Sequence, residues 1–107
     1  MNVLLDERIP RKLKHEIPSG NHVSTVMQAG WAGKKNGELL ALAQKKFDVF
    51  VTVDQNLSYQ QNISKYQIAE VLLEAKDNDI DTLRPLFSKA CRALESMENG
   101  RLFRIRS

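Results

Sequence analysis

The fold is decided by the stretch Asp48-Val49-Phe50-Val51-Thr52-Val53, which is the most strand-like segment of the chain. It is apolar and rich in β-branched residues, as strands are, and it ends in an acid, Asp54. A second run, Val3-Leu4-Leu5, is apolar without alternation, which is typical of a short buried strand. This run also ends in an acid, Asp6. The sequence therefore predicts two core strands, each with a carboxylate at its carboxyl end.

Strand and helix patterns alternate along the rest of the chain. Further strands are predicted over residues 22–26, 67–73 and about 102–105, and helices over residues 10–17, 38–46 and 82–97. The last helix is amphipathic and follows Asp77-Asn78-Asp79, which favours an N-cap. We expect a glycine-rich loop at 30–37 and a polar loop or irregular helix at 55–66. The alternation predicts an α/β fold with a mostly parallel sheet of about four to five strands flanked by helices.

The composition limits the class of protein. The chain has 107 residues, 42% of them hydrophobic, which fits one domain over residues 1–107. No apolar run reaches the roughly 20 residues of a membrane span, and Asp6 interrupts the apolar start that a signal peptide needs. Cys91 is the single cysteine, so neither an internal disulfide nor a zinc ribbon can form. We therefore expect no membrane association and a cytoplasmic location.

The net charge of +3 is unevenly distributed. Residues 1–46 hold eight Lys/Arg against four Asp/Glu, residues 47–83 two against seven, and residues 84–107 six against two. Basic segments favour a phosphate-bearing partner, since such binding is largely charge neutralisation with counterion release. On charge alone, a solvated surface explains the pattern as well.

The acids at the strand ends are the first candidates for chemistry. If the two core strands are neighbours, Asp6 and Asp54 lie about 5 Å apart across one strand spacing, a distance that one cation can bridge. Glu38, in the first turn of a predicted helix, could point toward the same crevice. Mg²⁺ prefers oxygen ligands and retains several waters, so two or three carboxylates suit it. The structural alternative is that Asp54 forms an Asx-turn and that Glu38 is simply favourable charge at a helix start.

The loops carry further candidates. Lys34 and Lys35 either contact a phosphate backbone or are ordinary surface lysines, since the glycines around them lack the spacing of a nucleotide-binding phosphate loop. Trp31 either stacks on a base or, more commonly for a tryptophan between glycines, fixes its loop to the core. After Asp54 the chain is dense in amides, which can donate to phosphates or order the loop internally. The amides concerned are Gln55, Asn56, Gln60, Gln61 and Asn62.

Three motifs follow one another along the chain: Leu4-Leu5-Asp6-Glu7-Arg8-Ile9-Pro10, Gly30-Trp31-Ala32-Gly33-Lys34-Lys35-Asn36-Gly37-Glu38-Leu39-Leu40, and Val51-Thr52-Val53-Asp54-Gln55-Asn56-Leu57 with Tyr59-Gln60-Gln61-Asn62. Together they resemble the small PIN-like family DUF5615 over roughly the whole chain. That family is similar to PIN-domain ribonucleases, including the toxins of bacterial toxin-antitoxin pairs. The resemblance implies a three-layer PIN-like fold in which acids bind Mg²⁺ or Mn²⁺ and activate water against RNA.

The resemblance assigns roles residue by residue. Asp6 matches the first-strand acid, Asp54 matches the acid of a Thr-x-Asp motif, and Glu38 corresponds to a helix acid, so these three are the expected metal ligands and catalytic residues. The expected contacts to the RNA backbone come from the loops. They are Lys34, Lys35, Gln55, Asn56 and Gln60. Candidate partners are an RNA substrate, a cognate antitoxin protein and a second copy of the chain.

The chain also departs from the family pattern. Asn36 and Asn56 stand where many PIN-like proteins have acids, and the loss of two carboxylates weakens metal affinity. A non-catalytic module that binds RNA or a partner protein is therefore the alternative. A third interpretation comes from pattern alone, because acids after the first and third strands are also found in phospho-acceptor receiver domains. Receivers need a lysine at the end of the last strand, where this chain has Arg104-Ile105-Arg106.

Replacing Asp54 by Asn tests the assignment of this acid. We expect Asp54→Asn to abolish RNA cleavage while the thermal midpoint stays unchanged or rises, because one of several crowded negative charges is removed. Cleavage of end-labelled RNA and thermal unfolding of the same preparations measure the two effects. A large fall in stability would instead assign Asp54 to the fold.

Overall fold

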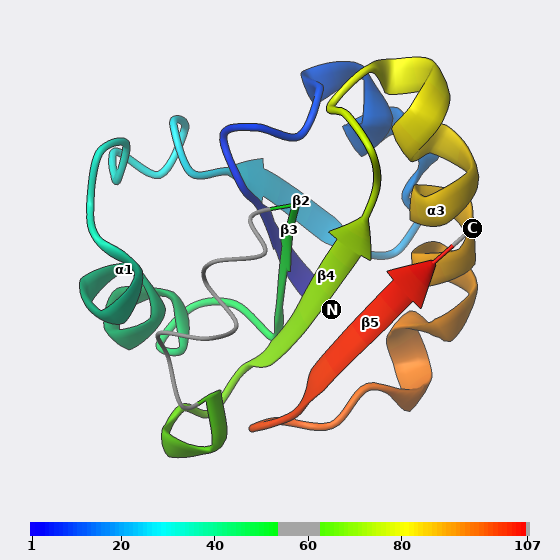
Figure 1. Cartoon of the computed structure of the whole chain (residues 1–107). Helices are drawn as coiled ribbons and strands as arrows, with labels where there is room; N and C mark the ends of the chain where they lie inside the picture. The colour runs from blue at the N-terminus through cyan, green and yellow to red at the C-terminus, as the bar shows by residue number, and fades with distance from the viewer. Residues whose placement is uncertain (54–62, 107) are drawn as a thin grey trace.

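The five strands form one sheet in the order β2-β1-β3-β4-β5, and every neighbouring pair is parallel. The computed structural model describes residues 1–53 and 63–106 (Figure 1). The strands are β1 (Asn2–Leu5), β2 (His22–Thr25), β3 (Val49–Thr52), β4 (Ala69–Glu74) and β5 (Leu102–Arg106). The helical segments are η1 (Arg11–Glu16), α1 (Asn36–Ala43), η2 (Ile63–Lys65), α3 (Ile80–Ala93) and η3 (Leu94–Ser96). The predicted α/β fold with a parallel sheet is confirmed.

Helices cover both faces of the sheet because successive side chains of a strand point to opposite sides. On one face, Val3, Leu5 and the alternate residues of β3 and β4 pack against α3 and η1. On the other face, Leu4 and Phe50 pack against α1. Figure 1 shows α1 and α3 on opposite sides of the strands. Strands buried on both faces explain why the core runs of the sequence are continuously apolar.

All three predicted helices differ from the prediction in form or bounds, and the one predicted over 38–46 is α1, Asn36–Ala43. The segment after β1 is a short 3-10 helix, η1, between Pro10 and Pro18, with Leu13 as its one buried residue. The long C-terminal helix begins at Ile80, and its α-helical part ends at Ala93 before the 3-10 turn η3. The prediction of one helix over 82–97 was therefore too late at its start and too long at its end.

At the N-terminus of α3, the acid that accepts a hydrogen bond is not the one at the N-cap position. Asp79 occupies the N-cap position but makes no side-chain capping hydrogen bond. Asp77 instead accepts the backbone N–H of Asp79 at 3.0 Å. The hydrogen bonds from Thr82 and from this N–H hold the pKa of Asp77 below its usual value. Asp79 thus occupies the predicted N-cap position without a side-chain capping bond, and Asp77 holds the turn that precedes the helix.

The pairing of β1 with β3 positions the candidate site. Leu5 lies opposite Val51, and the Asp6 backbone N–H continues the ladder by donating to the Val51 carbonyl at 2.9 Å. The chain runs from β1 to the edge strand β2 and then crosses back to β3, so the strand order reverses between β1 and β3. Ligands of open parallel sheets bind outside the carboxyl ends of the strands at such a point. Asp6 lies there.

Among the described residues, no helix is both long and apolar enough to cross a membrane.

The packing of α3 on the sheet can be tested at Phe87, whose side chain is 1% exposed. Phe87→Ala removes a buried ring, and we expect it to lower the free energy of unfolding by about 3–5 kcal/mol. The matched control is Arg92→Ala on the exposed side of the same helix, which we expect to change it by less than about 0.5 kcal/mol. Urea denaturation measures both. Equal small losses would show that α3 does not pack on the sheet.

Candidate functional site

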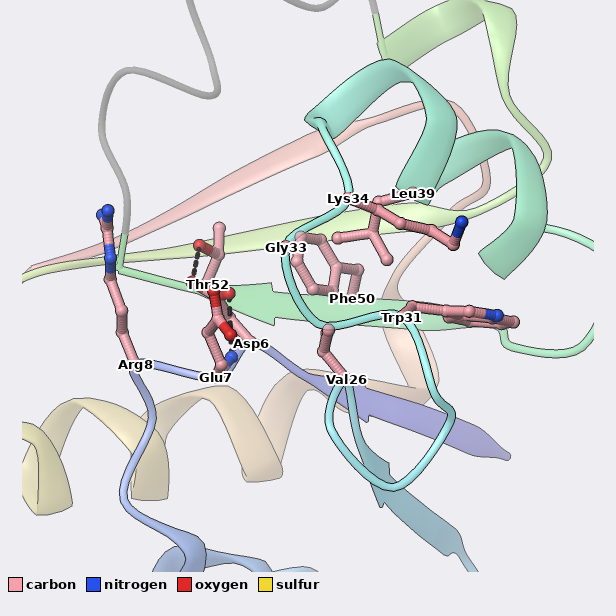
Figure 2. A pocket seen from close by; sticks show the side chains of 10 residues that line it. All are labelled: Asp6, Glu7, Arg8, Val26, Trp31, Gly33, Lys34, Leu39, Phe50 and Thr52. Carbon is pink, nitrogen blue, oxygen red and sulfur yellow. Dashed lines mark hydrogen bonds between the residues drawn. The ribbon is translucent and has the colours of Figure 1, made fainter.

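A cavity of about 190 Å³ opens at the carboxyl ends of β1 and β3, and we call it the Asp6 cavity. Its polar side comes from Asp6, Glu7 and Arg8 after β1 and from Thr52 at the end of β3. The loop that leads into α1 closes the other side (Figure 2). The remaining lining residues are Val26, Trp31, Gly33, Lys34, Leu39 and Phe50. The cavity lining thus combines two carboxylates, Asp6 and exposed Glu7, with two cationic side chains and an apolar floor.

Hydrogen bonds hold the Asp6 carboxylate in one orientation. Its Oδ2 accepts the hydroxyl of Thr52 at 2.9 Å, and its Oδ1 accepts the backbone N–H of Glu7 at 2.8 Å. The Asp6 carbonyl accepts the N–H of Ile9 at 3.0 Å, which turns the chain away from the strand. Both strands therefore fix this one side chain, since Thr52 belongs to β3 and Asp6 follows β1.

Burial sets the electrostatics of this carboxylate. Desolvation raises the pKa of Asp6 above its ordinary value of 3.8. The hydrogen bonds from Thr52 and Glu7 and the charge of Arg8 oppose that rise without cancelling it. The negative charge of Asp6 is therefore only partly compensated by the protein, and an additional cation in the cavity would stabilise it.

Glu38 and Lys34 form an ion pair on the rim. Lys34 Nζ lies 3.3 Å from Glu38 Oε1 in an i,i+4 pair, with side-chain exposures of 35% and 61%. Glu38 lines a separate shallow hollow with Lys35 and the loop glycines, and it is not among the residues that line the Asp6 cavity. The structure therefore brings Lys34 to the cavity but does not bring Glu38 together with Asp6. Its role as a ligand stays a prediction.

Several predicted site residues belong to the segment 54–62. Asp54, Gln55, Asn56 and Gln60 lie outside the described residues, as do Gln61 and Asn62 of the same segment. Their assignments stay predictions. What the structure does place is the strand that leads to Asp54, because β3 ends at Thr52, two residues before it.

Trp31 has the structural role that its glycine neighbours favour. Its ring meets that of Phe47 edge to face, with centroids 5.9 Å apart and an interplanar angle of 81°. It packs against the cluster of Leu4 and Phe50. This contact confirms that Trp31 fixes the loop before α1 to the core, and it gives the Asp6 cavity a firm wall.

Sequence reasoning missed two residues of the cavity. Thr52 is 1% exposed, and its hydroxyl binds Asp6. The signal was the Thr-x-Asp motif, in which only the acid was assigned a role. Arg8 lies two residues after Asp6 and lines the same cavity. Figure 2 draws Arg8 on one side of Asp6 and Lys34 on the other.

The donor set decides which metal suits the cavity. Among the described residues, no group of three or more His, Cys, Asp or Glu side chains gathers in one place. Asp6 supplies one carboxylate of the hard oxygen type, and Mg²⁺ is commonly held by one or two carboxylates, waters and substrate phosphates. Asp6 therefore fits Mg²⁺ or Mn²⁺ as one ligand of an open site, and it gives no support to a closed structural site.

Replacing Asp6 by Asn should stabilise the protein. The raised pKa means that folded Asp6 holds a proton more tightly than unfolded Asp6, so stability is lost as the pH rises from 3.8 through the folded value. We expect the thermal midpoint of Asp6→Asn to exceed that of the parent protein at neutral pH, with the difference shrinking on acidification below 3.8. Thermal unfolding across pH measures this. A destabilised variant at neutral pH would contradict it.

Comparison with protein-family models, with curated proteins and with solved structures finds no match for this chain. The Asp6 cavity and the motifs of the sequence are therefore the observations that bear on its function.

Proposed function

We propose that this protein is a metal-dependent ribonuclease of the PIN-like type, with Asp6 as a ligand of Mg²⁺ or Mn²⁺. One observation carries the proposal: a half-buried carboxylate stands at the point where the strand order reverses, held by Thr52 and only partly neutralised. Ligands of parallel sheets bind at such points. Carboxylates in desolvated clefts with shifted pKa values are typical of functional sites.

The proposed ligand set is Asp6 with Asp54, and Glu38 as a further ligand or water-orienting base. A bound divalent cation would neutralise charge on the phosphate and lower the pKa of a water. Thr52 keeps Asp6 oriented, and Val26, Leu39 and Phe50 form the apolar part of the cavity lining. Hydrolysis joins the oxygen of water to phosphorus and breaks the bond from phosphorus to a ribose oxygen, which leaves with a proton.

Positive charge around the cavity suits the phosphates of RNA. Arg8 and Lys34 line the cavity itself, and Lys35 is exposed beside it. The amides Gln55, Asn56 and Gln60 are proposed as further contacts to the RNA backbone. Because the sequence motifs resemble those of PIN-like nucleases, we also propose that the protein is a cytoplasmic toxin of a toxin-antitoxin pair. Its proposed partners are an antitoxin protein and a second copy of the chain.

A second function is favoured by a specific observation. Asn36 begins α1 where a PIN-like nuclease often has an acid, and Asn56 replaces another. In the described part of the cavity the acids are Asp6 and exposed Glu7. The two asparagines and this small number of acids favour a module that binds RNA or a partner protein without cutting RNA. A receiver is disfavoured, because the cations at the end of β5, Arg104 and Arg106, both bind Glu74 at 3.0 Å.

Cleavage of end-labelled RNA in Mg²⁺, in Mn²⁺ and in EDTA tests the proposal. We expect cutting in either metal and none in EDTA. The Asp6→Asn protein, purified in parallel to exclude a contaminating nuclease, should lose at least about 100-fold in rate, since a ligand and its charge are removed. Equal cleavage by both proteins would contradict the nuclease. Absence of cleavage in either metal, with undiminished RNA binding in EDTA, would also contradict it and would support the binding module.

A further inference from the structure

Two further hollows extend the Asp6 cavity along the outside of η1. The first, of about 320 Å³, shares Asp6, Glu7 and Arg8 with the cavity and reaches Arg11. The second, of about 330 Å³, begins at Arg11. It is otherwise lined by Lys12, Lys14, His15 and Gln28. Arg11 lines both hollows, so they adjoin one another in a line that leads away from Asp6. We call these two hollows the η1 track.

Cations dominate the η1 track. Its lining includes Arg8, Arg11, Lys12 and Lys14 against one exposed acid, Glu7, besides Asp6. The remaining acid of η1, Glu16, is turned to α3, where Arg84 lies 3.4 Å from its carboxylate. Within residues 1–53 and 63–106, no ion pair involves the basic residues of η1 itself. Their charge is therefore available to an external anion.

The other basic segment of the chain is arranged differently. On β5, both Arg104 and Arg106 bind the carboxylate of Glu74, and Lys89 Nζ donates to the Arg106 carbonyl at 2.9 Å. These cations and donors are engaged within the protein. The contrast identifies η1, and not the C-terminal strand, as the basic surface that faces outward next to the candidate site.

The side of the track formed by residues 25–28 is held by hydrogen bonds and carries an apolar side chain. Thr25 and Gln28 exchange hydrogen bonds, since each backbone N–H donates to the other side chain at 3.0 Å. Between them Met27 is 63% exposed, and it lines the middle hollow opposite Ile9 and Pro10. An exposed methionine is an adaptable apolar contact, which suits the face of an unstacked base and not the phosphate-lined outside of a duplex.

We infer that the η1 track binds the backbone of single-stranded RNA that leaves the candidate site, with phosphates on Arg11, Lys12 and Lys14 and a base on Met27. This inference rests on the proposed function for its choice of RNA. It adds a second arm to the binding surface, because the track leaves Asp6 past Arg8, whereas Lys34 stands on the other side (Figure 2). Backbone contacts of this kind position a strand without reading its sequence.

The test measures RNA binding without cleavage. Fluorescence anisotropy follows a labelled single-stranded oligouridine with the full chain in EDTA, at several salt concentrations. The track variant is Lys12→Glu/Lys14→Glu. The matched control is Lys45→Glu/Lys46→Glu, two exposed lysines that follow α1 near the opposite, amino edge of the sheet. Both variants change the net charge equally, so a difference between them reports position and not charge.

We expect the track variant to bind at least about tenfold more weakly, and its salt dependence to fall by about 1.4 in log–log slope, because two phosphate contacts are lost. The control should stay within about twofold of the parent protein. Equal weakening of both variants, or of neither, would overturn the inference. If Lys12→Glu/Lys14→Glu fails to fold, Lys12→Gln and Met27→Ser are measured singly, and unchanged binding by both would overturn it.

The design separates the two proposals. Weaker binding by the track variant supports the track even where the parent protein cuts no RNA, which would contradict only the nuclease. Metal-dependent cutting with unchanged binding by the track variant would contradict only the track. Duplex RNA of equal length should bind at least about tenfold more weakly than the single strand, and equal binding would overturn the choice of a single strand.

Discussion

The parallel pairing of β1 with β3 is the constraint on which the rest of the structure depends. It places Leu5 against Val51 in the core and continues by one hydrogen bond, from the Asp6 N–H to the Val51 carbonyl. The next residue of β3, Thr52, then donates its hydroxyl to the Asp6 carboxylate. The backbone hydrogen bonds between β1 and β3 are thus followed directly by the hydrogen bond between Thr52 and Asp6. The packing of the two strands in the core therefore fixes the orientation of the Asp6 side chain at the end of the strand.

That position creates an electrostatic imbalance. Burial disfavours the ionised form of Asp6 and raises its pKa. Two hydrogen bonds and the charge of Arg8 stabilise the ionised form, but their effect on the pKa is smaller than that of burial. Because the folded pKa is raised, the ionised form of this carboxylate lowers the stability of the fold, and carboxylates of this kind are typical of functional sites. Cations lie nearby, because Arg8 and Lys34 line the cavity with Asp6, and the basic residues of η1 line the hollows beyond Arg8. A cation at the carboxylate and a polyanion along the rim fit this distribution together.

The sequence was most informative where side chains are buried. The central strands were predicted because apolar runs such as residues 49–53 and 68–73 are typical of buried strands, and β2 was predicted from its alternation and β-branched residues. Asp6 was identified because an acid ends such an apolar run. The strand order was not predictable, since nothing local distinguishes β1 beside β3 from other windings. The role of Thr52 was missed because a β-branched residue in a strand already has an explanation. The η1 track could not be predicted from the sequence, because the sequence does not show which acid pairs with which basic residue. Glu16, for example, pairs with Arg84, which is far away along the chain.

The most direct test of the central claim, that Asp6 is a ligand of a divalent cation, is electron paramagnetic resonance of Mn²⁺ titrated into the purified protein. Free and bound Mn²⁺ give different signals, so the titration counts sites without any substrate or assumed reaction. One site per chain that is at least about tenfold weaker in Asp6→Asn is the predicted result. Absence of binding by the parent protein, or equal binding by the variant, would contradict the account.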